Sequence, residues 1–282
     1  MTLGVIAIIC AVASAAIGAV TGAFCDGSWL YVLPVSFLAC FIGMLAVIFL
    51  VIWTMCQVVD LEKPQEKDSP VYRKTTYFII RLILPILQVR MHIEGMEKVP
   101  ADRRILLVSN HLNDMDPVLL LYFFRKNQIA FISKRENSTM FLVGKLMHKI
   151  MCQLINREND REALKTILKC VQLLKDDEVS IGVFPEGYTS LDGLLHPFRH
   201  GVFKIAQKAQ VPIVVCTLRN TQYIFKNAKR LKPTDVYLNV LKVIPAEELK
   251  GITAVEVGNR VHKLMADDLG PELVLKPKKE TP

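Results

Sequence analysis

A histidine and a carboxylate able to move a proton together stand five positions apart, as His111 and Asp116. They follow the apolar run of residues 105–109, which predicts a buried strand. An imidazole titrates near neutral pH and can take a proton from a hydroxyl group. If Asp116 accepts a hydrogen bond from one ring nitrogen, the other nitrogen is left free as the base. The pattern therefore predicts general-base chemistry at the end of a strand.

Two further features of this segment bear on that prediction. Asp116 followed by Pro117 is also typical of a helix start, with aspartate as the N-cap and proline in the first helical position. That alternative explains Asp116 without a catalytic role. No serine or cysteine stands obviously beside the pair in the sequence, which favours direct base catalysis on a bound hydroxyl over a covalent relay.

A second polar loop follows another apolar run. Residues 179–184 lead into Pro185, Glu186 and Gly187, and Ser190 comes shortly afterwards. Proline and glycine around a glutamate shape a loop that projects one carboxylate from a strand end. Taken alone, the segment is more typical of an ordinary turn than of a functional site.

Short apolar runs alternate with helical patterns from residue 89 onward. Predicted strands cover residues 89–94, 105–109, 129–133, 151–155, 179–184, 211–217 and 236–244. Predicted helices cover residues 117–125, 138–149, 160–175, 201–209 and 254–269. The alternation predicts an α/β domain over residues 89–282, with a largely parallel sheet flanked by helices. In such sheets functional groups gather where strand ends meet loops, which is where both polar loops fall.

Together these residues resemble the glycerolipid acyltransferase family, typified by the 1-acylglycerol-3-phosphate (lysophosphatidate) acyltransferases. The family's first block, Asn-His-x-x-x-x-Asp, matches Asn110, His111 and Asp116. Its third block, Phe-Pro-Glu-Gly-Thr-Arg-Ser, is matched by residues 184–187 and by Ser190. A second block, which ends in an arginine, resembles residues 154–157, and a fourth, an apolar strand with a proline, resembles residues 211–214. The four blocks keep the family's order across residues 89–217.

The resemblance implies acyl transfer from acyl-CoA or acyl-carrier protein to a lipid hydroxyl. His111 would deprotonate that hydroxyl, and Asp116 would hold the imidazole and stabilise its charged form. Arg157 would hold a phosphate, which suits the forked guanidinium group. Glu186 and Gly187 would help bind the acceptor or shape its site, and Asn110 and Ser190 are the further substrate-binding residues that the resemblance implies. The thioester is a co-substrate, so no cofactor is expected, and no cysteine or carboxylate cluster completes a metal site around the histidines.

The chain departs from the family at one position. Tyr188 and Thr189 stand where the third block carries Thr-Arg, so a phosphate-binding arginine is absent there. The charge would have to come from another cation, although the commoner fate of each candidate is a solvated surface residue. These candidates are Lys134, Arg135, Arg161 and Arg199. The departure weakens lysophosphatidate as the acceptor and leaves the acyl-transfer prediction intact.

Residues 1–59 form a separate segment with a single charged side chain, Asp26. Two apolar stretches, residues 3–24 and 29–59, each reach the 20 or so residues that a membrane-spanning helix needs. A tight connector at residues 25–28 predicts a helical hairpin, which crosses the bilayer or enters one leaflet. A cleaved signal peptide is a poorer fit, because no lysine or arginine precedes residue 63.

Positive charge begins directly after the second stretch, at Lys63 and Lys67. This asymmetry predicts a cytoplasmic location for everything that follows the hairpin. The net charge of +8 favours contact with anionic lipid headgroups. Nucleic acid is not an expected partner, because neither an interleaved aromatic stripe nor zinc-finger spacing is present.

Residues 60–88 connect the hairpin to the α/β domain. The first part is polar with two prolines and predicts a linker. The second part is apolar except for Lys74, Arg81 and Gln88, which recur every seven residues. One polar stripe on an apolar helix predicts an amphipathic helix in the membrane interface, and a buried first helix of the domain is an equal alternative.

Three functional hypotheses remain open at this level. The first is a membrane-bound 1-acylglycerol-3-phosphate O-acyltransferase that makes phosphatidate for phospholipid synthesis. The second keeps the chemistry but changes the acceptor to another lysophospholipid or lipid alcohol. The third is a non-catalytic membrane protein that binds lipid or acyl-carrier protein, which has no need for His111 and Asp116.

Overall fold

The computed structural model describes residues 2–275, which divide into two compact units at residues 60 and 61. The first unit is a helical hairpin made by α1 (Thr2–Val20), the short α2 (Ala23–Asp26) and α3 (Trp29–Gln57). Gly22 and Gly27 flank α2 with positive φ angles of 73° and 78°, a backbone conformation that favours glycine. The predicted hairpin therefore reverses direction through one extra helical turn and two glycines.

Two serines of the hairpin are hydrogen-bonded between α1 and α3, and many of its large apolar side chains face outward. The Ser14 hydroxyl donates to the Leu33 carbonyl at 2.7 Å and lies 2.8 Å from the hydroxyl of Ser36. Large apolar side chains such as Val20 (88% exposed) and Leu30 (69%) face outward. Both α1 and α3 are long and apolar enough to cross a membrane, and their outward apolar surface is what a lipid environment accepts.

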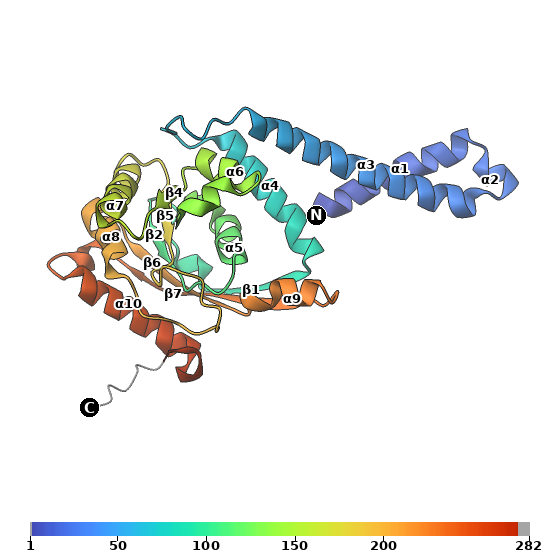
Figure 1. Cartoon of the computed structure of the whole chain (residues 1–282). Coiled ribbons are helices and arrows are strands. Elements are labelled where there is room, and N and C mark those ends of the chain that lie inside the picture. The colour runs from blue at the N-terminus through green and yellow to red at the C-terminus, as the bar shows by residue number, and fades with distance from the viewer. Residues whose placement is uncertain (1, 276–282) are drawn as a thin grey trace. The chain divides into compact units, whose positions relative to one another are not determined.

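The second unit is built on a seven-stranded sheet within the described residues (Figure 1). Its strands, in chain order, are β1 (Val89–Glu94), β2 (Leu106–Val108), β3 (Ile129–Lys134), β4 (Gln153–Ile155), β5 (Ser180–Val183), β6 (Ile213–Arg219) and β7 (Thr234–Ile244). They lie in the order β1-β7-β6-β2-β5-β3-β4, and every neighbouring pair is parallel except β6 and β7. The predicted fold class, a largely parallel sheet flanked by helices, is confirmed.

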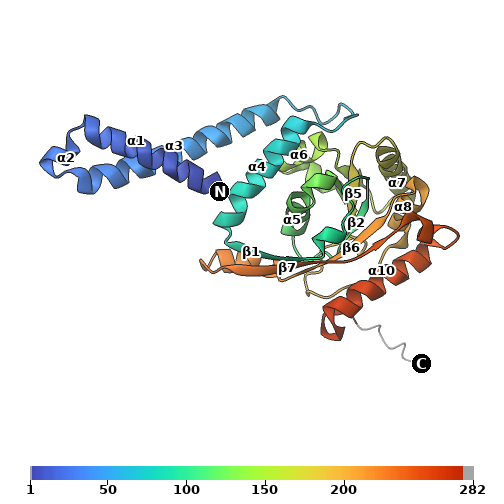
Figure 2. The ribbon, with the colours of Figure 1, turned by 180° about the vertical axis from the view of Figure 1, so that it is seen from behind.

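Helices cover both faces of this sheet (Figures 1 and 2). One face packs against α7 (Asp160–Lys175), α8 (Lys204–Ala209) and α10 (Ala254–Leu269). The other packs against α4 (Pro70–Ile86), α5 (Met115–Phe123) and the start of α9 (Ile224–Ala228). Along β2, Leu106 and Val108 belong to the first layer and Leu107 to the second, as the alternation of a strand requires. The central strands are therefore buried on both sides, which explains their unbroken apolar sequences.

The remaining short elements are α6 (Val143–Lys149) and seven 3₁₀ turns. The turns are η1 (Met96–Lys98), η2 (Arg125–Asn127), η3 (Arg135–Thr139), η4 (His200–Phe203), η5 (Thr221–Tyr223), η6 (Ala246–Leu249) and η7 (Pro271–Leu273). The helix predicted at residues 138–149 is wrong in its first part, because the chain there forms the end of η3 and a turn before α6 begins. Leu142 just ahead of α6 has φ +57°, which interrupts a continuous helix.

Helix α4 is fastened to the α/β unit by a buried arginine. The Arg73 guanidinium is bound to the Asp68 carboxylate, at 2.6 Å from Nε, and also donates to the carbonyls of Ile129 and Ile150. Lys74 and Arg81 of the predicted polar stripe are exposed, while Ile80 packs into the core. The helix therefore packs as the first helix of the domain and keeps its charged stripe at the surface.

Candidate active site

The two polar loops meet at one edge of the sheet because β2 and β5 are parallel neighbours. Leu106, Leu107 and Val108 pair with Ile181, Gly182 and Val183, so both strands end at the same level. The loop after β2 carries His111, and the loop after β5 carries Glu186. The backbone of the two loops is joined directly, since the Ser190 N–H donates to the His111 carbonyl at 2.7 Å. The sheet register thus brings together residues more than seventy positions apart.

His111 and Asp116 form the pair that their spacing predicts. His111 Nδ1 lies 2.9 Å from Asp116 Oδ2. The same oxygen accepts the N–H groups of Leu112 at 2.6 Å and Asn113 at 2.7 Å. Because Oδ2 acts as an acceptor in all these contacts, Nδ1 carries the ring proton and Nε2 is left as the basic nitrogen.

The helix-start interpretation of Asp116 is wrong in detail. Helix α5 begins at Met115 with Asp114 at the N-cap, so Asp116 lies inside the first turn instead of capping it. Its carboxylate turns back onto the loop that precedes the helix, where it binds His111 and two backbone N–H groups. Asp116 is fully buried (0% exposed), and this loop is held in place by its carboxylate.

The Phe184 ring fixes the other face of the histidine. Phe184 stacks on His111 with ring centroids 4.2 Å apart, and on Phe131 of β3 at 5.2 Å. The imidazole is consequently held between an aromatic wall and a buried carboxylate, with 15% of its side chain exposed. A base that is held in one orientation and still reachable can act on a bound substrate.

Glu186 is a buried clamp between the loops. Its Oε1 accepts the backbone N–H of His111 at 2.9 Å, and its Oε2 accepts the Ser190 hydroxyl at 2.6 Å and the His196 N–H at 3.0 Å. Burial raises the pKa of Glu186, and these three donors only partly offset that effect. Glu186 and Ser190 are each 1% exposed and hydrogen-bonded to protein groups. In this structure the two side chains hold the loops together, and their predicted role toward the substrate stays a prediction.

Asn110, a predicted substrate-binding residue, is hydrogen-bonded within the protein. Its side-chain amide donates to the Leu218 carbonyl at 2.9 Å and accepts the Leu218 N–H at 2.8 Å. Both hydrogen-bonding groups of the amide are thus used by the backbone of β6, and the side chain is 1% exposed. Asn110 joins β6 to the segment that directly follows β2 and carries His111.

Two cations lie beside the loop after β5. A Cβ atom added to Gly187, which has φ +82°, would lie 2.9 Å from Cδ and Nε of Arg199. Arg157 is half-buried, and its pKa is lowered by burial and by the neighbouring charge of Arg199. No carboxylate among residues 2–275 lies at ion-pair distance from either guanidinium. Arg135, another candidate cation, pairs instead with Glu162 at 3.8 Å.

Thr189 contacts the histidine of the site, which the sequence does not predict. Its hydroxyl lies 3.0 Å from His111 Nε2, the basic nitrogen of the pair. The sequence drew attention to this position only because an arginine was expected there. Its place follows from the backbone, because Thr189 directly precedes Ser190, whose N–H donates to the His111 carbonyl.

Comparison with known proteins identifies the family. The family model described as Acyltransferase matches residues 90–219. A probable 1-acyl-sn-glycerol-3-phosphate acyltransferase of Mycoplasma pneumoniae is 30% identical over 194 residues, covering 67% of this chain and 72% of the relative. The chain belongs to the acyltransferase family.

Other relatives of this acyltransferase agree with that assignment. The 1-acyl-sn-glycerol-3-phosphate acyltransferase of Cocos nucifera is 29% identical over 252 residues, covering 86% of this chain and 78% of the relative. The crystal structure of the 1-acyl-sn-glycerophosphate (LPA) acyltransferase PlsC from Thermotoga maritima matches with a TM-score of 0.59. It covers 73% of this chain and 81% of that structure at 23% identity, so the two chains share the fold. The resemblance drawn from the four sequence blocks is confirmed.

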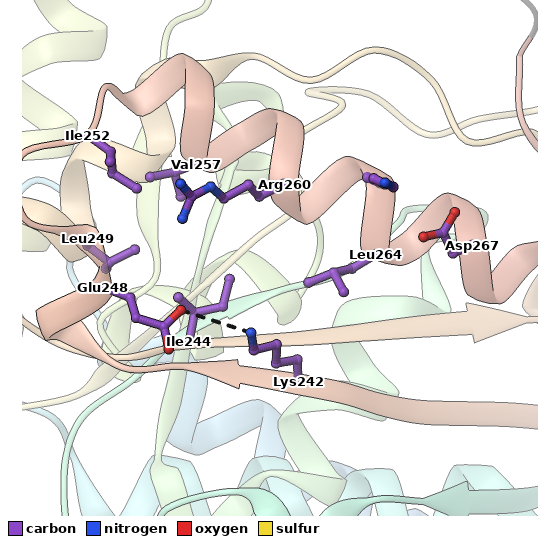
Figure 3. A pocket seen from close by; sticks show the side chains of 10 residues that line it. Lys242, Ile244, Glu248, Leu249, Ile252, Val257, Arg260, Leu264 and Asp267 are labelled. Carbon is purple, nitrogen blue, oxygen red and sulfur yellow. Dashed lines mark ion pairs between the residues drawn. The ribbon is translucent and has the colours of Figure 1, made fainter.

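Two hollows in the surface of this acyltransferase differ in their relation to His111. One, of about 410 Å³, is lined by Asn110 and Leu112 on either side of the histidine, and by Arg219, Tyr223 and Tyr237. The other, of about 320 Å³, lies between β7, η6 and α10, where Lys242 pairs with Glu248 at 3.9 Å (Figure 3). Of these two hollows, only the one of about 410 Å³ adjoins the loops that follow β2 and β5.

Proposed function

We propose that this acyltransferase moves a fatty acyl group from a thioester donor to the free hydroxyl of 1-acylglycerol-3-phosphate, giving phosphatidate for phospholipid synthesis. The observation that supports the chemistry is the His111 ring, oriented by Asp116 at 2.9 Å and presenting Nε2 as a base. The printed names of the relatives support the acceptor. Acyl-CoA and acyl-carrier protein are the two donors to test, and no cofactor takes part.

The phosphate of the acceptor is held by cations close to the loops. Arg157 and Arg199 lie near one another without a carboxylate partner in the described part of the chain, and Arg199 lies against Gly187. Two like charges side by side repel, and an anion between them relieves that repulsion. Arg199 is thus the best-placed substitute for the arginine missing from the third sequence block.

A second acceptor class follows from the same departure. Thr189 occupies the position that carries an arginine in the family, so this position has no cation to offer a phosphate. The Thr189 side chain instead contacts His111. Another lysophospholipid or a lipid alcohol is therefore the alternative acceptor. The third hypothesis, a non-catalytic binding protein, predicts that loss of the His111 base changes nothing in turnover.

The test measures thiol release by the full chain purified in detergent, with acyl-CoA or acyl-carrier protein as donor. Lysophosphatidate and lysophospholipids with other headgroups are compared as acceptors. We expect turnover with lysophosphatidate and a loss of about 10²–10⁴-fold in the His111→Ala variant, the usual contribution of a general base. His148→Ala, a histidine on α6, is the matched control and keeps wild-type turnover. Equal turnover by wild type and His111→Ala would overturn the mechanism.

We further propose that the hairpin spans the membrane and leaves the α/β unit on the cytoplasmic face. The two long apolar helices and the positive charges after the second support this arrangement. Membrane lipids are then direct partners of α1 and α3, and the exposed Lys74 and Arg81 on α4 face anionic headgroups.

A single cysteine reports on this topology. Cys25 lies exposed in the connector between α1 and α3, which a spanning hairpin places on the non-cytoplasmic side of the membrane. Burial raises the pKa of Cys152 to about 11 and those of Cys170 and Cys216 to about 12, so these thiols stay unreactive near neutral pH. In sealed membrane vesicles whose non-cytoplasmic side faces outward, a membrane-impermeant maleimide should label the chain and spare the Cys25→Ser variant. Labelling only after the vesicles are opened would contradict the spanning topology.

A further inference from the structure

The loop after β3 ends in exposed apolar side chains. Met140, Phe141 and Val143 have 48%, 66% and 42% of their surfaces exposed. They lie between η3 and α6, where the sequence predicts a continuous helix. Three large apolar side chains within four positions leave a surface that gains free energy when it is removed from water. We call residues 140–143 the apolar tip.

The apolar tip is held in a strained turn. Leu142 has φ +57° and ψ −44°, and the Val143 N–H donates to the Phe141 carbonyl at 2.6 Å, which makes a γ-turn with a positive φ at its centre. Such a turn is rare and strained for leucine, and it persists where the surrounding structure imposes it. Gly144 is part of that constraint, because a Cβ atom there would collide with the Ser138 carbonyl. Close packing of α6 on η3 therefore fixes the position of the tip.

The apolar tip leaves the sheet at the edge where His111 lies. β5 is the parallel neighbour of both β2 and β3, so the loops after all three strands extend from one edge, which we call the catalytic edge. The loop after β5 adds another apolar side chain, Leu191, which is 94% exposed. The catalytic edge thus carries two exposed apolar loops in addition to the base.

Cations accompany the apolar tip. Lys134 precedes it and Lys145 follows it, and Glu136 is the only carboxylate between them in the sequence. Arg135 adds a third positive charge and lies 3.8 Å from Glu162 in an exposed pair. Apolar side chains bracketed by cations complement a bilayer with anionic headgroups, which offers an apolar interior and negative charge together. A second copy of this chain would bring the same positive charges to the contact and repel them.

The helix that follows the tip is fastened to the chain that leaves the hairpin. The Lys149 ammonium group donates to Gln65 Oε1 at 2.9 Å, and the Lys149 carbonyl accepts the Ser69 N–H at 3.1 Å. Gln65 follows the last residue of α3 by eight positions. α6 also packs beside α4, the helix that carries the exposed Lys74 and Arg81 (Figures 1 and 2). The tip therefore belongs to a part of the α/β unit that the chain reaches soon after the hairpin.

We propose that the apolar tip and Leu191 insert into the surface of the bilayer, so that the catalytic edge faces the membrane. The lipid hydroxyl then reaches His111 without leaving the lipid phase. This inference rests on the proposed function and adds to it a second membrane contact, made by the α/β unit itself. The hairpin keeps the enzyme at the membrane, and the two apolar loops set the direction in which its site faces.

An insertion of this kind affects acceptors in a bilayer more than dissolved acceptors. Burial of a phenylalanine side chain changes an equilibrium constant by roughly 10- to 100-fold. The Phe141→Asp variant should therefore raise KM for long-chain lysophosphatidate in vesicles by about tenfold or more. A short-chain lysophosphatidate that dissolves as single molecules does not depend on the insertion. The loss measured in vesicles should accordingly exceed the loss measured with the dissolved acceptor by about the same factor.

The first experiment measures insertion directly and needs no turnover. Trp29 and Trp53, the two tryptophans of the chain, are replaced by phenylalanine, and one tryptophan is introduced by Phe141→Trp. The full chain is reconstituted in vesicles of phosphatidylcholine and phosphatidylglycerol. Lipids brominated on their acyl chains should quench most of the emission of this variant.

Val255→Trp in the same background is the matched control. Val255 is 51% exposed near the start of α10. Because β7 runs antiparallel to β6, it ends at the edge opposite the catalytic edge, and η6 leads from there to α10. A tryptophan at this position should keep its emission. Equal quenching in the two variants, or none in either, overturns the insertion.

The remaining outcomes separate this inference from the function beneath it. Equal losses of Phe141→Asp with vesicle-borne and dissolved acceptors overturn the insertion and leave the transfer reaction standing. Absence of turnover by the wild type with every donor and acceptor overturns the transfer reaction, and the quenching result still decides the insertion. Conversion of an oligomer to a monomer by Phe141→Asp, without quenching at position 141, would assign the tip to a contact between copies. Circular dichroism verifies that each variant is folded.

Discussion

Asp116, in the first turn of α5, and Glu186, in the loop after β5, are both buried, yet the two carboxylates do different work. Asp116 gives its bonding oxygen to the His111 ring and to the backbone beside it. Glu186 gives both oxygens to backbone N–H groups and to the Ser190 hydroxyl. The comparison shows that burial alone does not make an acid catalytic. The role of a buried carboxylate follows from the groups that donate hydrogen bonds to it.

The largest expected effect lies on the Asp116 side of this comparison. In the Asp116→Asn variant an amide oxygen can still accept from His111, but the negative charge that stabilises the imidazolium is gone. We expect kcat/KM to fall by about 10²–10⁴-fold with the fold retained. Steady-state kinetics and circular dichroism measure the two parts of this prediction.

Asp114→Asn is the matched control for that change. Asp114 is exposed at the N-cap of α5 and makes no side-chain capping bond, so its charge serves neither the helix nor His111 directly. Its turnover should equal that of the wild type. Equal losses in the two variants would mean that the general acidity of the loop, and not the His111 contact, matters.

The Glu186→Gln variant should affect stability more than chemistry. Whichever way the amide is turned, its NH₂ group faces a backbone N–H, of either His111 or His196. An unsatisfied buried donor costs about 1–3 kcal/mol, and we expect a loss of that size in the free energy of unfolding. Urea unfolding in detergent measures it, with the exposed Glu158→Gln as control. A kinetic loss as large as that of Asp116→Asn, without destabilisation, would make Glu186 part of the chemistry.

Ser190→Ala, which also weakens the contacts of Glu186, should lower the free energy of unfolding by less than Glu186→Gln does. It removes one donor from Glu186 and leaves the two backbone donors in place. The expected destabilisation is about 1 kcal/mol, the typical net value of one hydrogen bond. Combined with Glu186→Gln in a double-mutant cycle, the losses should fall short of additivity, because both changes remove the same contact. Strict additivity would show that the two side chains act independently.

The smallest expected effect is a pH dependence carried by Glu186. Its pKa is raised in the folded state, so the folded protein holds this proton to higher pH than the unfolded chain does. Ionisation therefore costs stability as pH rises through the folded-state pKa, and this cost is absent below the ordinary value of 4.5. The stability of the wild type relative to Glu186→Gln should increase as pH falls from neutrality towards 4.5. A difference that stays constant over that range would refute the titration.

The sheet was predictable because its strands are short, apolar and bounded by polar residues. All seven predicted strands are present, and β1 has the predicted limits. Two short helical elements were harder to foresee. Helix α9 has only five residues and begins with the buried Ile224, too short for a helical period to emerge. The sequence predicts one continuous helix from the end of η3 to the end of α6. The break lies at Leu142, whose backbone conformation is unusual, but leucine is an ordinary helix residue and gives no sign of a break.

In the site, the sequence identified residues better than roles. His111 and Asp116 are local partners, so their spacing was enough to predict their contact. Asn110 and Ser190 are satisfied by groups distant in sequence or in the opposite loop, and only the strand register reveals those partners. The contact between Thr189 and His111 cannot be predicted from the sequence for the same reason, because it depends on β2 and β5 ending at one level.

The position of β1 at the edge of the sheet has a consequence for how the chain is made. Its partner is β7, and His92 and Asp235, which are hydrogen-bonded across this pair, are 143 residues apart. At a synthesis rate of about 5–20 residues per second, β1 waits on the order of ten seconds for β7 to leave the ribosome. The α/β unit therefore completes its sheet only after β7 has been made, and β1 stays without its strand partner until then.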